Sequence, residues 1–170
     1  RFWARNFNAY AVAQLSSPEQ LLSMRQELEG MNHFKRSIAV WWFHSWVAEA
    51  LLDAGKTQEA LEELETASGL IERSDERWGQ AEVERIRGEC LWRLEEATQA
   101  EHWLRRAMAS ARGIGALTLE LRAALSLHRL LEGSSRSAEG CEMLAPICAR
   151  FDAGSRLWEW QAARQILGNG

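Results

Sequence analysis

The sequence predicts an all-α fold, a right-handed α-solenoid of stacked helical hairpins with a repeat of about 40 residues. The composition is typical of helices, because Ala, Leu, Glu and Arg are abundant and only two of the 170 residues are proline. Small and apolar residues let paired helices approach closely and bury a common face. They recur in three sets that align without a gap: Ala48, Leu51, Ala60, Leu64 and Ala67; Gly88, Leu91, Ala100, Leu104 and Ala107; His128, Leu131, Gly140, Leu144 and Ile147.

The first half of the chain is expected to form four helices, over residues 2–15, 17–30, 33–54 and 57–73. Ser17 caps the second of these, with Pro18 in its first turn. The third is rich in aromatic residues and ends at Gly55, because glycine favours the end of a helix. Thr57 is expected to cap the fourth.

The second half is expected to add five helices. Ser74 or Asp75 caps the fifth, which contains Trp78 and Trp92, and residues 95–98 form a turn before the sixth. The sixth ends near Arg112, where a pair of glycines breaks the pattern. The last three helices are expected over residues 116–132, 137–152 and 155–167.

These nine helices leave no room for a separate domain, so residues 1–170 are expected to form a single helical-repeat domain. Its first residue is Arg1 rather than methionine and lies inside an apolar pattern, which suggests a fragment of a larger protein. The repeats are expected at about residues 1–32, 33–73, 74–113 and 114–153, followed by a capping helix over residues 155–167.

Charge and cysteine usage narrow the functional classes. The net charge of −4 gives no basic field that would draw the chain onto nucleic acid or an anionic membrane. We expect neither a signal peptide nor a membrane span, since no apolar run in the sequence is long enough to cross a bilayer. Cys141 and Cys148 lie two helical turns apart, too far for a disulfide, so we expect reduced thiols and a cytoplasmic location.

The repeat pattern has a family resemblance. The set from Gly88 to Ala107 resembles a tetratricopeptide repeat, with units longer than the usual ~34 residues. Residues 77–89, 100–107, 119–127 and 144–147 resemble the C-terminal helical-repeat region of large bacterial signalling ATPases. In that family an adenylate/guanylate cyclase or DNA-binding module and an ATPase module precede the repeats, and maltose-regulon-type transcription activators have a similar layout. The resemblance covers about residues 38–167, with Arg87 and Glu95 in place of an expected leucine and glycine.

No residue pattern indicates catalysis, a cofactor or a metal. The segment 54–57 imitates the end of a phosphate-binding P-loop, but Ala50 stands where the motif needs glycine, and a helix replaces the preceding strand. Gly113 and Gly115 lack the third glycine of a dinucleotide fingerprint. The four histidines are scattered, without metal-ligand spacing, and the carboxylates lie on recurring polar faces. We therefore expect a chain that is not an enzyme.

The nine tryptophans leave two interpretations open. They could fill gaps left by small residues between hairpins, or Trp42 and Trp92 could anchor a partner segment in a groove while arginines pair its carboxylates. If the geometry of tetratricopeptide repeats transfers, the concave groove is lined by Trp42, Ser45, Glu49, Glu82, Arg85, Glu89, Trp92, Arg122 and Arg129.

The most favoured function is a non-catalytic scaffold that binds a protein, peptide or small ligand and acts as the sensor or regulatory region of a larger signalling or transcription-regulating ATPase. The partner is expected to be a protein or peptide segment, including upstream modules of the same chain, rather than nucleic acid or a membrane. A self-association module that forms homo-oligomers is the alternative, because an excised solenoid exposes apolar ends. A more remote alternative is an enzyme with an unrecognised site in the groove.

Overall fold

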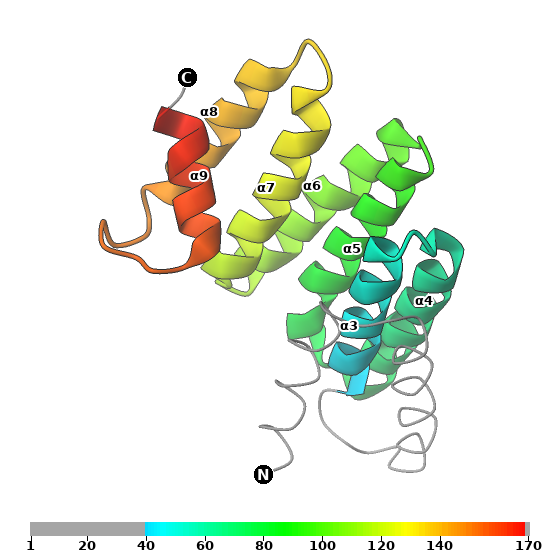
Figure 1. The fold of residues 1–170 in the computed structure, drawn as a ribbon. Helices are drawn as coiled ribbons and strands as arrows, with labels where there is room; N and C mark the ends of the chain where they lie inside the picture. The colour runs from blue at the N-terminus through cyan, green and yellow to red at the C-terminus, as the bar shows by residue number, and fades with distance from the viewer. Residues whose placement is uncertain (1–39, 169–170) are drawn as a thin grey trace. The chain divides into compact units, whose positions relative to one another are not determined.

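The computed structural model describes residues 40–168, and every regular element in that range is helical (Figure 1). This confirms the all-α prediction for the described part of the chain. The helices predicted over residues 2–15 and 17–30, the first predicted repeat and the start of the third helix lie outside it. Residue contacts divide the chain into two compact units, Arg1–Gly79 and Gln80–Gly170.

The described part of the first unit is a helical hairpin. Helix α3 (Val40–Asp53) packs against α4 (Thr57–Ser74), and a single 3-10 turn, η1 (Arg77–Gly79), follows. Small and branched apolar residues from both helices form the buried seam: Val47, Ala48, Leu51, Leu52, Ala60, Leu64, Ala67 and Ile71. The small and leucine positions of the predicted repeat are therefore buried here.

Trp41 fixes the end of this unit. Its side chain is buried, and its indole Nε1–H donates a hydrogen bond of 2.7 Å to Glu76 Oε2. A Cβ atom on Gly79 would lie only 2.4 Å from the Trp41 ring. Glycine is therefore required for the backbone of η1 to approach the indole.

The second unit contains five helices, α5 (Gln80–Arg93), α6 (Ala97–Gly113), α7 (Leu117–Glu132), α8 (Ser137–Cys148) and α9 (Trp158–Gly168). Each helix packs against the next one along the chain, and α7 also contacts α5 and α9 (Figure 1). One continuous core joins the last four: Ala100, Leu104, Ala107, Leu121, Ala124, Leu127, Leu131, Leu144, Ile147 and Ala163 are among its buried members. Helix α7 is central to this unit because it contacts all four of the others, α5, α6, α8 and α9.

Helix beginnings recur at a constant interval. Thr57, Ala97 and Ser137 each begin a helix, and Leu117 begins another midway between the last two. The 3-10 turn begins at Arg77, midway between the first two.

The turns before these helices also recur. Gly55, Glu95 and Gly115 have φ values of 76°, 63° and 69°, in the left-handed region. In each case the next N–H donates to a carbonyl five residues back: Lys56 to Leu51 at 2.8 Å, Glu96 to Leu91 at 2.9 Å and Ala116 to Ala111 at 2.9 Å. This is the Schellman pattern that ends a helix.

The side-chain caps predicted at two helix starts are wrong. Lys56, rather than Thr57, occupies the N-cap of α4, and no side chain caps it. Asp75 has a left-handed φ of 56° and ends α4, so neither it nor Ser74 caps the fifth helix. The Schellman turn at Gly55 ends α3 and leads directly into α4.

Three other boundaries differ from the prediction. Helix α6 begins at Ala97, inside the predicted turn, because the left-handed residue is Glu95. Helix α8 ends at Cys148 rather than at residue 152, and Pro146 lies within its last turn. Helix α9 begins at Trp158 rather than at residue 155, and Ser155 accepts a hydrogen bond from the Leu157 N–H in the preceding turn.

Burial confirms most of the predicted core. Leu64, Leu104 and Leu144 are fully buried, whereas Leu91 is only partly buried and packs at the margin of the second core. The prediction of full burial is therefore wrong for Leu91, although the equivalent residues Leu51 and Leu131 are buried. None of the three cysteines forms a disulfide. Over residues 40–168, no helix has the length and apolar character needed to cross a membrane.

Candidate functional site

The first-unit members of the predicted groove lie on α3. Ser45 is buried, and its hydroxyl donates a hydrogen bond of 3.0 Å to the Trp41 carbonyl. It therefore points into the unit and offers no surface to a partner. Glu49 and Trp42 are partly buried. The Trp42 ring lies 5.1–5.9 Å from three other tryptophan rings, those of Trp41, Trp46 and Trp78.

Five second-unit members of the predicted groove form one ion-pair network. The repeat register predicted only that they share a face. On α5, Arg85 pairs with Glu82 at 2.8 Å and with Glu89 at 3.0 Å. From α7, Arg122 reaches Glu82 at 2.8 Å and Arg129 reaches Glu89 at 3.2 Å. The network therefore links α5 to α7 at two places.

Two members of this network were missed from the sequence. The Ser126 hydroxyl donates to Glu89, and the Glu159 carboxylate of α9 lies 3.8 Å from Arg122 Nε. Ser126 stands four residues after Arg122 on α7, so helical spacing could have placed it on the same face. No comparable spacing points to Glu159, which comes from another helix.

Burial decides which of these groups a partner could reach. The Arg85 side chain is only 4% exposed, whereas Arg122 is 22% and Arg129 is 52% exposed. Arg85 therefore contributes to the internal structure of the network. Arg129 is the most accessible of the three arginines proposed to read charge.

The network lowers the pKa of two glutamates. Burial by itself would raise the pKa of Glu82, but the charges of Arg85 and Arg122 outweigh it, and the resulting pKa is lowered. Burial likewise opposes ionisation of Glu89, and Arg85, the Ser126 hydroxyl and Arg129 together lower its pKa. Both carboxyl groups are therefore ionised partners of arginines rather than proton donors at neutral pH.

Trp92 packs against the hydrophobic core of the second unit and is partly buried. This contact supports the gap-filling interpretation for this tryptophan. Its remaining exposed surface lies at the end of α5, one residue before that helix ends. An anchoring role would therefore have to coexist with a packing role.

Two further carboxylates are almost fully buried and are satisfied by arginines. Glu84 receives Arg106 Nε at 2.8 Å and the Ser110 hydroxyl at 2.7 Å. The two carboxylate oxygens of Glu120 pair with Arg112 Nε at 2.9 Å and with an Arg150 guanidinium nitrogen at 2.6 Å. These pairs link α5 to α6, α6 to α7 and the segment after α8 to α7, and they compensate both buried charges.

The P-loop-like segment lies in the turn between α3 and α4, as expected for a helix-to-helix connection. Lys56 Nζ donates a 3.0 Å hydrogen bond to Glu59 within this hairpin. Among the residues that the structure describes, no group of three or more histidine, cysteine or acidic side chains is arranged to hold a metal ion.

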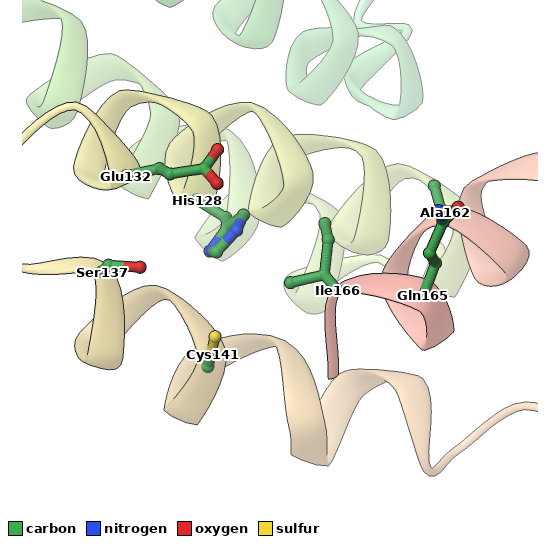
Figure 2. A pocket seen from close by; sticks show the side chains of 7 residues that line it. All are labelled: His128, Glu132, Ser137, Cys141, Ala162, Gln165 and Ile166. Carbon is green, nitrogen blue, oxygen red and sulfur yellow. The ribbon is translucent and has the colours of Figure 1, made fainter. Parts of the chain in front are cut away.

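A pocket of about 420 Å³ opens between α7, α8 and α9 (Figure 2). His128 and Glu132 line it from α7, and Ser137 and Cys141 from α8; the lining contributed by α9 consists of Ala162, Gln165 and Ile166. Figure 2 shows the imidazole of His128 projecting from α7 toward α8. Sequence reasoning passed over this histidine because no metal-ligand spacing surrounds it.

Comparison of the sequence with protein-family models and with curated proteins finds no match.

Proposed function

We propose that this chain is a tetratricopeptide-like helical-repeat module whose function is to bind a protein or peptide segment without catalysis. The observation that carries the proposal is the constant interval at which helices begin, at Thr57, Ala97 and Ser137. A shared turn geometry at Gly55 and Glu95 supports it. Modules built from such repeats form extended surfaces, and binding is their usual task.

The face that carries the ion-pair network is the proposed partner surface. It presents Arg129 and part of Trp92, while Arg85 holds Glu82 and Glu89 in fixed positions. Three arginines and three glutamates compose the network, so its charges balance. We therefore propose recognition by local pairing with a partner carboxylate beside an apolar contact, rather than by attraction to net charge.

In the wider proposal, this surface passes the bound state to the cyclase, DNA-binding or ATPase modules of a cytoplasmic signalling protein. The family resemblance of residues 38–167 supports that setting. Self-association is the second candidate function. Adjacent Leu157 and Trp158 are 40% and 61% exposed, and exposed large apolar side chains favour contact with a second copy.

The test selects peptides from a random displayed library on the immobilised chain and measures the affinity of the enriched sequences. We expect peptides that combine an acidic residue with a large apolar one, and Arg129→Glu should weaken their binding about tenfold. Arg156→Glu, at an exposed turn residue before α9, is the matched control and should change little.

Trp92→Ala separates anchoring from packing. We expect a lower melting temperature, because the indole packs against the core of the second unit, together with weaker peptide binding. A melting decrease with unchanged affinity would remove Trp92 from the partner surface. Failure to enrich any peptide, or equal binding by Arg129→Glu, would refute the proposed surface. Sedimentation of the isolated chain as a concentration-dependent dimer would favour self-association instead.

A further inference from the structure

One position of the hairpin register has an unusual occupant. Where the earlier hairpins have Ala48 and Gly88, the third has His128, and it faces Gly140 at the place of Ala60 and Ala100. A Cβ atom on Gly140 would lie 2.4 Å from His128 Nδ1. Removal of a methyl group on α8 therefore makes room for an imidazole on α7.

This imidazole is buried without satisfying its polar atoms. His128 is 2% exposed, and its Nδ1 has no hydrogen-bond partner within the described chain. An unsatisfied buried polar atom is unfavourable by about 1–3 kcal/mol. The same imidazole lines the adjoining pocket.

The ring has one favourable tautomer in this setting. Nδ1 lies against the Gly140 backbone, and its lone pair tolerates that contact better than an N–H group with no acceptor would. The proton then resides on Nε2. Because the ring lines the pocket, this Nε2–H is the donor available to a bound molecule.

The remaining lining defines the chemistry of that molecule. Glu132 supplies a carboxylate, and no lysine or arginine lines the pocket, so its charge favours a cation over an anion. Ala162 and Ile166 supply an apolar wall, while Ser137 adds a hydroxyl. The volume is within the range of small-molecule sites, about 300–1,000 Å³.

We propose that the pocket between α7, α8 and α9 binds a small organic amine that has an apolar body and a hydrogen-bond acceptor at its other end. The ammonium group pairs with Glu132, the body packs on Ile166, and the acceptor receives the His128 N–H. This site is distinct from the proposed peptide surface, so either proposal can fail without the other.

The experiment titrates the ¹⁵N-labelled full chain with tyramine and follows backbone and histidine side-chain resonances. Tyramine has the required ammonium, aromatic body and hydroxyl. We expect saturable shifts at α7, α8 and α9, including the His128 ring, with a Kd in the millimolar range or tighter for so small a molecule. The matched probe 4-hydroxyphenylpropionate, with a carboxylate in place of the ammonium, should produce none.

Two variants test the assigned contact. Glu132→Gln changes an exposed residue and should raise the tyramine Kd about threefold or more, while Glu142→Gln, at an exposed residue of α8 outside the pocket lining, should leave it unchanged. The proposal is overturned if tyramine causes no saturable shift, if the carboxylate probe binds equally well, or if Glu132→Gln binds tyramine as the natural chain does.

Discussion

Single residues in this chain act through backbone geometry as much as through side-chain chemistry. The left-handed turn residue is glycine at position 55 but glutamate at position 95. For a residue with a Cβ atom, the left-handed conformation is unfavourable by about 1–2 kcal/mol. The surrounding Schellman hydrogen bonds hold Glu95 in that conformation.

The substitution Glu95→Gly is therefore expected to raise the free energy of unfolding by about 1 kcal/mol, after the greater freedom of glycine in the unfolded chain offsets part of the gain. Urea unfolding monitored by circular dichroism measures this change. The control is Glu96→Gly, because Glu96 has an ordinary φ of −86° and gains no relief from glycine. Equal effects of the two substitutions would contradict the turn assignment.

The same residues show what the sequence could predict. The repeat pattern predicts glycine at position 95, and the glutamate that stands there adopts the same left-handed turn conformation. Arg85 and Glu89 were predicted to share a face, and the ion pair between them was not foreseen. Side-chain pairing depends on rotamers and on neighbouring helices, which sequence spacing does not specify. His128 became a candidate site residue only when the structure showed Gly140 packed against its ring.

At the scale of helices, the ion-pair network connects α5 with α7 and makes their contact sensitive to pH. The folded pKa values of Glu82 and Glu89 are both lowered. A lowered folded pKa means that the unfolded chain binds protons first as the pH falls. The network therefore stabilises the fold fully above the ordinary carboxyl range and loses that contribution as the pH falls through the folded pKa values.

We expect Glu89→Gln to reduce stability by about 1–3 kcal/mol at neutral pH, because Arg85 and Arg129 lose a charged acceptor. The difference from the natural chain should shrink as the pH falls through the lowered folded pKa of Glu89, because the carboxyl group is then protonated in both folded and unfolded chains. Urea midpoints across this pH range provide the measurement. A constant difference at every pH would mean that Glu89 is not ionised in the fold, whereas Glu142→Gln should show little effect at any pH.

Helix boundaries were less predictable than helix existence. All seven helices expected after residue 30 have counterparts in the described range, but several begin two or more residues from the predicted position. Side-chain caps such as Thr57 and Asp75 were expected to set the starts. In the structure no side chain caps α4 at Lys56, and Asp75 ends α4 instead of starting the next helix. Helix ends are the least certain part of any helix assignment, by one or two residues.

For the whole molecule, the central prediction concerns how far a local defect spreads. A solenoid couples each hairpin mainly to its neighbours, whereas a single cooperative core loses stability throughout. Leu104 is fully buried in the core shared by α6, α7, α8 and α9, so Leu104→Ala should reduce the stability of that core by about 2–5 kcal/mol.

Hydrogen exchange measured by mass spectrometry can locate this loss along the chain. We expect Leu104→Ala to accelerate exchange strongly from α5 to α9, because Leu104 lies against Gly88 of α5 and belongs to the core shared by α6, α7, α8 and α9, and to affect α3 and α4 much less. The matched substitution Leu64→Ala, at the equivalent buried position of the first unit, should produce the reverse pattern. Uniform acceleration in both variants would instead favour one domain that unfolds as a single unit. Confined effects in both variants would support repeat-by-repeat stability, in which a partner bound to one hairpin stabilises its neighbours most.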